Sequence, residues 1–461
     1  MVNPPATDYV AEVLGVRTFP VGLVHLAAYL REKGFDVRIL DCPAEGIGPG
    51  ELRSAVKGYD AVGFTATTPA APSAYRAARE VRDVVDVVFL GGPHPTFMDE
   101  EAVRESGADF VVRGEGEITT VEALEAFDTW GEPDLSDVRG ITYPVDGKVV
   151  RNPDRPPIEN LDSLPLPAYD LIDIDAYAVD GKRFVPVVTS RGCPFGCAFC
   201  ASSRMFGRRW RGRSPARVVE EIVMLVEEFS VRRVEIVDDV FTLNRKRARE
   251  VCKGLREEGV DVPWDCSSRA DTVDPDLAKE LSRSGCETVY IGAESGDDET
   301  LERIGKGITT SDVVSCVKTL KNAGLRVVAS FIIGFPWEDR KDVRRTVKFA
   351  KRCGADYAQF TILTPYPGTP MFEELKREGL IETFDWSKYT TVDPVIRTKH
   401  LTSKDLSLLI KYAYLSFYAD PRFLIKRLSE GDVFLIKKIL KEAPKTLLRA
   451  VLTAFNKGFG R

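Results

Sequence analysis

Histidine is scarce in this chain, because only His25, His94 and His400 among its 461 residues can supply an imidazole. No apolar run approaches the roughly 18 residues that a membrane helix needs, and no secretory leader is recognisable. The 64 basic residues are outnumbered by 70 acidic ones, so no overall positive field indicates a nucleic-acid-binding protein. Nine cysteines spread over this length favour reduced thiols in the cytoplasm and exclude a disulfide scaffold.

Three of the nine cysteines lie within eight residues of one another, in the segment Arg191-Gly-Cys-Pro-Phe-Gly-Cys-Ala-Phe-Cys200. An apolar run at 184–190 predicts a short buried strand before it, and its glycines and proline favour a curled loop. Three thiolates on one loop can hold three irons of a cubane iron–sulfur cluster and leave the fourth iron without a protein ligand. A zinc site, the alternative, needs a fourth cysteine or histidine. The candidate ligands are Cys193, Cys197 and Cys200.

The remaining cysteines show no such pairing. Four of them stand in apolar or helical surroundings and are interpreted as small buried hydrophobic residues, namely Cys252, Cys286, Cys316 and Cys353.

The Cys-x3-Cys-x2-Cys loop, with aromatic Phe199 before its third cysteine, resembles the signature of the radical S-adenosylmethionine (SAM) superfamily. The resemblance implies a [4Fe-4S] cluster whose open iron binds SAM, at the mouth of a (β/α)6 partial barrel. The N-terminal region contains only Cys42, so the second cluster that a methylthiotransferase would carry there is not expected.

Residues 1–130 alternate short apolar strands with helical patterns, which predicts a doubly wound, Rossmann-like parallel sheet with ligands beyond the carboxyl ends of its strands. The expected strands are 37–40, 61–64, 87–90 and 110–112, and the expected helices are 21–33, 73–84 and 99–106.

This segment resembles the cobalamin-binding domain of one class of radical SAM enzymes; a doubly wound domain without a cofactor is the alternative. Asp41 and Gly46 match the usual Asp-x-His-x-x-Gly frame, but Pro43 replaces the histidine and cannot ligate cobalt. His94 either approaches the corrin or is a hydrogen-bonding surface residue. The resemblance assigns cobalamin contacts to strand-end residues Asp41, Pro43, Gly46, Thr65, Thr67, Gly91, Gly92, His94, Gly114 and Glu115.

Residues 131–183 are expected to form a linker with a hairpin at 140–150, followed by proline-rich segments. Residues 184–375 then repeat the strand–helix unit six times, which predicts the partial barrel with its site at the strands' carboxyl ends. The expected strands are 184–190, 233–238, 261–267, 287–293, 326–333 and 357–363.

Polar residues recur after these strands, as a ligand with an amine, a carboxylate and a ribose requires. By resemblance, Asp238 or Asp239 lies near the SAM amine, Arg269 and Glu294 face its carboxylate or ribose, and Gly334 packs on the adenosyl group. The full expected SAM set is Phe199, Asp238, Asp239, Arg269, Glu294, Ser295 and Gly334.

Residues 376–461 are expected to form a helical, basic C-terminal region, with twelve Lys and Arg against five Asp and Glu after residue 399. Apolar groups such as 423–425, 434–436 and 447–448 give it an amphipathic helical pattern. Two interpretations stay open: helices docked under the barrel with lysines in water, or an interfacial helix on anionic lipid.

The resemblance as a whole predicts a cobalamin-dependent radical SAM enzyme, a C-methyltransferase that acts on an unactivated carbon through a 5′-deoxyadenosyl radical and methylcobalamin. The alternatives are cyclisation, rearrangement or C–C coupling without methyl transfer, and a non-enzymatic corrin- or metal-binding regulator. We expect a small-molecule or lipid substrate, a one-electron donor such as ferredoxin or flavodoxin, no nucleic acid, and a cytoplasmic location with peripheral membrane contact as the alternative.

Overall fold

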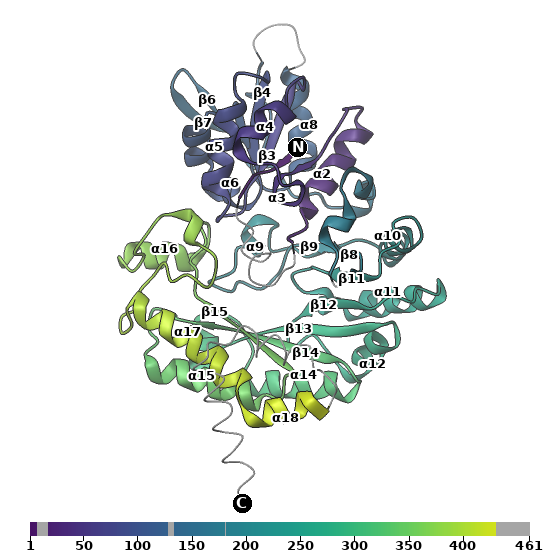
Figure 1. Cartoon of the computed structure of the whole chain (residues 1–461), viewed down its shortest axis with the longest axis vertical. Coiled ribbons are helices and arrows are strands. Elements are labelled where there is room, and N and C mark those ends of the chain that lie inside the picture. The colour runs from purple at the N-terminus through teal and green to yellow at the C-terminus, as the bar shows by residue number, and fades with distance from the viewer. Residues whose placement is uncertain (7–16, 128–132, 180, 430–461) are drawn as a thin grey trace, which may run out of the picture.

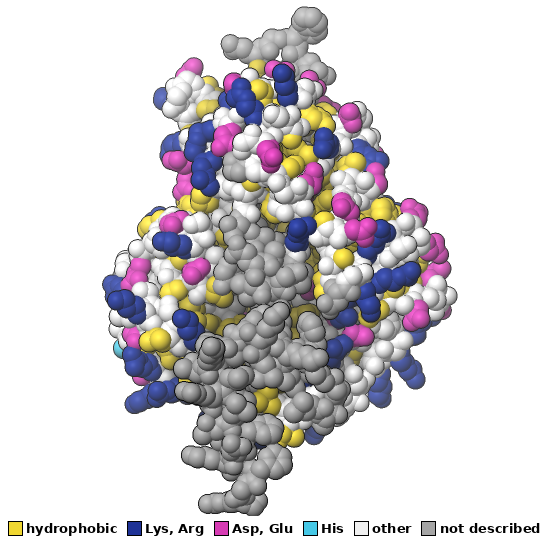
Figure 2. Space-filling view, viewed as in Figure 1, with side chains coloured by type: hydrophobic (Ala, Val, Ile, Leu, Met, Phe, Trp, Pro, Cys, Tyr) yellow, Lys and Arg dark blue, Asp and Glu magenta, His cyan; other side chains and the backbone are white. Residues whose placement is uncertain are grey.

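The computed structural model describes residues 1–6, 17–127, 133–179 and 181–429. The chain forms two lobes, each built on its own parallel sheet, with the N-terminal lobe above the C-terminal one in Figure 1. Side chains of both charge signs are interspersed on the face seen in Figure 2. None of the helices in the described part of the chain is both long and apolar enough to cross a bilayer.

The first sheet has seven strands in the order β2-β1-β3-β4-β5-β6-β7, with helices on both faces. The first five strands in the chain pair in parallel, which confirms the expected parallel sheet and adds β1 to the four expected strands. They are β1 (Val2–Asn3), β2 (Leu40–Asp41), β3 (Ala61–Thr65), β4 (Val87–Gly91) and β5 (Phe110–Val112). The helices are α2 (Val21–Glu32), α3 (Cys42–Glu45), α4 (Pro49–Ala55), α5 (Ala71–Val81), α6 (Pro93–Phe97), α7 (Asp99–Ser106) and α8 (Gly116–Phe127).

The strand expected at 37–40 is wrong in its extent, because β2 begins only at Leu40. Its partner β1 is two residues long, and Val2 and Asn3 pair with Leu40 and Asp41. Residues before Leu40 therefore face no strand with which they could continue the ladder.

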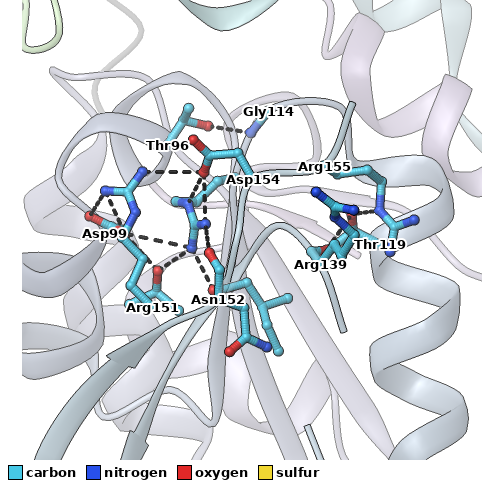
Figure 3. A network of polar contacts seen from close by, with 12 residues as sticks. Thr96, Asp99, Gly114, Thr119, Arg139, Arg151, Asn152, Asp154 and Arg155 are labelled. Atoms are coloured by element: carbon cyan, nitrogen blue, oxygen red, sulfur yellow. Dashed lines mark hydrogen bonds and ion pairs between the residues drawn. The ribbon is translucent and has the colours of Figure 1, made fainter. Parts of the chain in front are cut away.

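The hairpin expected at 140–150 is formed by β6 (Ile141–Val145) and β7 (Lys148–Arg151), and it extends the first sheet antiparallel to β5. Buried Arg113, directly after β5, donates to the carbonyl oxygens of Ile141 and Asn152 and pairs with Asp154 at 2.8 Å. Figure 3 shows Asn152 and Asp154 within this network of polar contacts. A buried guanidinium with this many acceptors binds the hairpin to the sheet edge.

The second sheet contains six parallel strands in chain order, β15-β14-β13-β12-β11-β8, as the sequence predicts. Each strand starts and ends within three residues of its expected position: β8 (Phe184–Val187), β11 (Arg233–Ile236), β12 (Trp264–Ser268), β13 (Cys286–Glu294), β14 (Arg326–Ile333) and β15 (Tyr357–Ile362). Most of the covering helices begin at a capping side chain; Asp339, for example, accepts from the backbone of Asp342 in the first turn of α15. The helices are α10 (Pro215–Glu227), α11 (Arg245–Glu257), α12 (Pro275–Arg283), α13 (Asp298–Arg303), α14 (Thr310–Asn322), α15 (Arg340–Arg352), α16 (Pro370–Arg377), α17 (Ser403–Tyr418) and α18 (Pro421–Ser429).

The helix α17 closes the open edge of this sheet. The hydroxyls of Tyr414 and Tyr418 donate to the carbonyl oxygens of Phe360 and Ala358 on β15 at 2.9 and 2.8 Å, and accept from the same residues' amides. An edge strand satisfied in this way offers no free ladder to another chain. The described part of the C-terminal region is thus docked on the barrel, whereas the apolar groups at 434–436 and 447–448 lie outside the described residues.

We expect Arg113→Ala to lower the free energy of unfolding by about 3–5 kcal/mol, because it leaves buried acceptors without a donor. The matched control is Arg151→Ala, since the Arg151 side chain is 49% exposed and pairs with the same Asp154; we expect it to cost less than about 1 kcal/mol. Urea denaturation followed by circular dichroism measures both. Equal losses in the two variants would contradict the role given to Arg113.

Candidate functional site

The cysteine loop leaves the first barrel strand and returns through a short antiparallel pair, β9 (Ser190–Arg191) with β10 (Arg211–Gly212). At the start of the loop Gly192 has φ +85°, and a Cβ there would lie 2.5 Å from the carbonyl oxygen of Arg209. Only glycine fits this close approach. The tight base therefore projects the three cysteines above the carboxyl end of β8, where α9 (Ser202–Met205) follows them.

Backbone contacts anchor the inner side of the loop. The Ala198 amide donates to Ile304 and its carbonyl accepts from Met371, at 2.9 and 3.0 Å. Phe199 lies edge-on to Phe335, 6.4 Å between ring centres. The loop is therefore held by the barrel on both sides.

The three thiols share one environment. Cys197 is 9% exposed and its two partners are half-buried, and all nine cysteines of the chain are free. Burial raises the pKa of Cys193 to about 11 and also raises that of Cys197, where the Lys306 ammonium opposes it. Binding of iron at these thiols must therefore release protons. Among the described residues no group of three His, Cys, Asp or Glu side chains is arranged to hold a single metal ion.

Arg269 stands beside the loop with one unused donor. Its guanidinium lies 3.6 Å above the Phe195 ring, and it bonds to Asp271 and to the Lys306 carbonyl at 2.9 and 2.6 Å. The side chain is buried, yet its Nη1 has no partner among the described residues. A buried donor of this kind requires an acceptor, and the carboxylate of a ligand in the barrel mouth would satisfy it.

Glu294 and Lys306 form a buried ion pair of 2.6 Å that the sequence analysis missed on the lysine side. Glu294 follows a bulge in β13 and has φ +58°, which turns its side chain toward Lys306. Lys306 stands between Gly305 and Gly307, both with positive φ. A lysine between two glycines after a short helix is the one signal in the sequence that points to this loop.

Asp238, one of the two aspartates expected near the SAM amine, is hydrogen-bonded to protein groups. Its carboxylate accepts four hydrogen bonds of 2.5–3.0 Å from the amides and hydroxyls of Thr189 and Ser190. All its acceptor capacity is used to hold the chain just before the cysteine loop. The neighbouring Asp239 is exposed on the rim, yet the surrounding protein desolvates its carboxyl and raises its pKa, opposed by a hydrogen bond from Ser202.

Ser295 likewise points away from the mouth. It is fully buried, its hydroxyl lies 3.3 Å from that of Thr346 on α15, and it accepts from the Asp297 amide. These contacts pack β13 on the helix layer, so the structure does not place Ser295 with the other candidate SAM residues.

Gly334 does lie at the mouth, in a turn held by a buried carboxyl. Glu338 accepts from the amides of Gly334 and Phe335 at 2.7 and 3.0 Å. Gly334 has φ +91°, and a Cβ there would lie 3.0 Å from Leu406. Burial raises the pKa of Glu338 to about 8, although the two amides oppose this shift.

The candidate cobalamin residues of the first lobe lie at the carboxyl ends of its strands. Asp41 caps α3 by accepting from the Ala44 amide at 3.3 Å, and Gly46 ends that helix with φ +70°. The second carboxylate oxygen of Asp41 accepts a hydrogen bond from the Tyr177 hydroxyl, so the connector uses this acceptor. Pro43 lies in the first turn and presents no donor atom.

The loop after β4 packs tightly against the end of β3. Gly92 has φ +99°, and a Cβ there would lie 2.9 Å from Thr65 Oγ1. Thr65 and Gly91 are half-buried and Thr67 is exposed, so small or polar groups line this edge. A flat ligand can therefore approach the backbone closely.

His94 is not a surface residue, which corrects one of our two interpretations. Its ring is fully buried between Tyr75 and Trp386, 6.1 and 5.0 Å from their ring centres. Trp386, in the C-terminal region, also donates to Glu101 of α7 at 2.7 Å. The contact between the lobes therefore buries this imidazole.

Glu115 binds protein and not a ligand edge. Its carboxylate pairs with Arg211 at 2.5 Å, lies 3.7 Å from Arg191, and accepts from the Ile158 amide. Glu117 pairs with Arg191 at 2.5 Å. Burial acts to raise the pKa of Glu117, but the charge and the hydrogen bond of Arg191 act against it, and the pKa is lowered. These buried pairs join the loop after β5 to the base of the cysteine loop, so we name Glu115, Glu117, Arg191 and Arg211 the inter-lobe clamp. Gly114, at the start of that loop, lies close to Met205 of the lower lobe.

The raised pKa of Glu338 makes a pH prediction. The unfolded chain loses this proton near pH 4.5 and the folded chain only near 8, so wild-type stability falls as pH rises between these values. Glu338→Gln carries no titrating carboxyl, so its free energy of unfolding should not show this fall. At about 1.4 kcal/mol per pKa unit, the stability of the variant relative to wild type should therefore be a few kcal/mol higher at pH 8 than at pH 5. Urea unfolding at both pH values measures it, with Glu373→Gln on the exposed face of α16 as control. A constant difference between wild type and Glu338→Gln would refute the assignment.

Comparison with known proteins agrees with this geometry. The family model of the radical SAM superfamily matches residues 187–350, and that of the B12 binding domain matches residues 8–124. An uncharacterized methyltransferase of Pyrococcus horikoshii is 45% identical, over 96% of this chain and 96% of that protein. An anaerobic magnesium-protoporphyrin IX monomethyl ester cyclase of Rubrivivax gelatinosus is 32% identical, over 88% of this chain and 74% of the cyclase.

Solved structures confirm the expected fold. The radical SAM methyltransferase TsrM of Kitasatospora setae, with cobalamin and a [4Fe-4S] cluster bound, has a TM-score of 0.70 at 19% identity, over 91% of this chain and 90% of that one. The cobalamin-dependent SAM radical enzyme OxsB has a TM-score of 0.74 at 17% identity, over 99% of this chain and 70% of that one. The alternative of a non-enzymatic regulator is thereby set aside. The chain belongs to the cobalamin-binding radical SAM enzymes, whose cofactors are a [4Fe-4S] cluster, SAM and cobalamin.

Proposed function

We propose that the protein is a C-methyltransferase that acts on an unactivated carbon. The observation that carries the proposal is the inter-lobe clamp, which brings the loop after β5 of the first lobe against the base of the cysteine loop. A methyl donor on the first lobe and a radical generator on the second need this proximity. The name of the Pyrococcus relative supports the same reaction.

When bound, the cofactors supply a 5′-deoxyadenosyl radical and a cobalt-held methyl group. The chain's own residues bind, orient and exclude water. We propose that Cys193, Cys197 and Cys200 hold the cluster and that Arg269 Nη1, which is buried and has no partner in the described part of the chain, binds the SAM carboxylate. Asp239 is then the carboxylate on the rim that receives the amine.

The neighbouring residues complete the proposed SAM site. The Glu294–Lys306 pair lies beside the cysteine loop and suits the ribose hydroxyls, because each partner keeps hydrogen-bonding capacity. The turn at Gly334, with Phe335 against Phe199, suits the adenosyl group. Asp238 and Ser295 are positioning residues in this proposal, since protein groups already occupy their polar atoms.

On the first lobe we propose that Thr65, Thr67, Gly91, Gly92 and Gly114 line the cobalamin site, with residues 1–130 as its domain. Pro43 and buried His94 leave no imidazole for the lower face of cobalt. The barrel at 184–375 then carries the substrate, and the connector and C-terminal region hold the lobes together.

Cyclisation is the second candidate reaction, because a relative at 32% identity is named a magnesium-protoporphyrin monomethyl ester cyclase. Two other relatives, from Chlorobaculum tepidum, are named bacteriochlorophyllide d methyltransferases. A tetrapyrrole therefore joins lipids and other small molecules as a candidate substrate. Anaerobic incubation with SAM labelled in its methyl group separates the two: methyl transfer moves the label into the product, and cyclisation does not.

We further propose a one-electron donor of the ferredoxin or flavodoxin type, no nucleic acid, and a cytoplasmic location, which nine free thiols support. Membrane contact in this proposal is peripheral and made through the C-terminal region.

Replacement of Cys197 by Ala should abolish reductive SAM cleavage and leave the fold intact, because a cubane loses a ligand while the barrel core lies elsewhere. Iron content and 5′-deoxyadenosine formation are the readouts, with about four irons per chain expected in wild type. Cys353→Ala, a buried thiol outside the loop, is the control and should retain both. Full 5′-deoxyadenosine formation by the Cys197 variant would overturn the cluster assignment.

The cobalamin prediction concerns the lower face of cobalt. With Pro43 in the ligand position and His94 buried, the cob(II)alamin form should show no superhyperfine splitting from a coordinated nitrogen in electron paramagnetic resonance. His94→Ala should leave that spectrum unchanged. Nitrogen splitting that disappears in this variant would show that the imidazole reaches the metal.

A further inference from the structure

The outer face of α15 carries a row of cations without carboxylate partners. Arg344, Lys348 and Arg352 follow one another at four-residue spacing, which places them on one side of the helix, and all three are exposed. None of them forms an ion pair within the described residues, whereas other cations of the same helix do. Lys351, for example, pairs with Asp420 at 2.9 Å.

The outer face of α17 carries a row of apolar side chains. Leu408, Tyr412 and Leu415 are 66%, 41% and 43% exposed and lie on one side of this helix. The opposite side is buried and includes Leu406 and Ala413. Burial in the barrel therefore does not explain the outward row.

One member of the apolar row, Tyr412, lines the same groove as the cations of α15. A hollow of about 440 Å³ lies between α15, α17 and the start of α18, and Tyr412 of the apolar row forms part of its wall. Its cationic wall comes from α15 and α18. We give the name α15–α17 face to this groove together with the apolar row of α17. The residues that line the groove include Arg344, Lys348, Arg352, Tyr412 and Arg422.

The positive charge of the α15–α17 face is not a general property of the surface. A groove between α11 and α12 contains Lys246, Lys253 and Lys279, but Glu250, Asp276 and Glu280 line the same groove. The chain as a whole has a net charge of −6.

We propose that the α15–α17 face docks on the surface of an anionic lipid bilayer. Cations without partners gain from the negative surface potential, and exposed leucines and a tyrosine gain by entering the headgroup region. An acidic protein partner would use the cations but not the apolar row, so the combination favours the bilayer. This inference deepens the proposed peripheral membrane contact and extends it from the C-terminal region, which contains α17, to α15 of the barrel; it is independent of methyl transfer.

The test is sedimentation of the full-length protein with vesicles, which requires no turnover. Vesicles of phosphatidylcholine are compared with vesicles that contain 40% phosphatidylglycerol. We expect binding only to the anionic vesicles, and weaker binding when salt shortens the range of the interaction. The triple variant R344Q/K348Q/R352Q and the double variant L408S/L415S should each weaken binding about tenfold or more.

The control is K246Q/K253Q/K279Q, which removes the same number of positive charges, three, from the groove between α11 and α12. This variant should bind the vesicles as wild type does. Circular dichroism confirms that each variant is folded. Absence of wild-type binding, equal loss in the control, or full binding by both face variants would each overturn the proposal. Binding of the wild type to an acidic flavodoxin but not to vesicles would assign the cations to a protein partner and overturn it too. None of these failures bears on methyl transfer.

Discussion

Arg191 lies two residues before Cys193, and the carboxylates of Glu117 and Glu115 from the other lobe hold its guanidinium. Arg211 pairs with Glu115 and lies directly across the β9–β10 ladder from Arg191. The four charged groups of the clamp are buried, and each is neutralised by a partner of opposite charge. Removal of one partner would leave an unpaired buried charge, at a cost of about 3–5 kcal/mol. The separation of the two strand-end edges depends on this clamp.

A second contact between the lobes works from the C-terminal side. Trp386 donates to Glu101 and packs on His94, and Gly368 lies so close to Phe97 of α6 that a Cβ would meet its ring at 2.2 Å. Together with the clamp, this contact joins the lobes at two places. A fixed position of the lobes suits a reaction whose chemistry comes from cofactors.

The helix α17 serves the barrel on one side and leaves the other side free. Tyr414 and Tyr418 satisfy the edge of β15, which fixes the rotation of the helix about its axis. Leu408, Tyr412 and Leu415 then point outward beside the cations of α15 as a consequence of that rotation. The same packing that completes the fold thus creates the α15–α17 face.

Local patterns were enough to predict the cysteine loop, the six barrel strands and the parallel first sheet, because cysteine spacing and apolar periodicity need no tertiary contact. These patterns did not determine which polar residue at a strand end faces a ligand. Asp238, Ser295 and Glu115 are chemically suitable, but tertiary partners occupy their polar atoms. Lys306 reaches Glu294, twelve residues away in the chain, only because a bulge turns β13. His94 is buried because Trp386, nearly 300 residues later, lies against it. Hydrogen-bond capacity and burial are properties of the packed structure, so only the tertiary structure decided these roles.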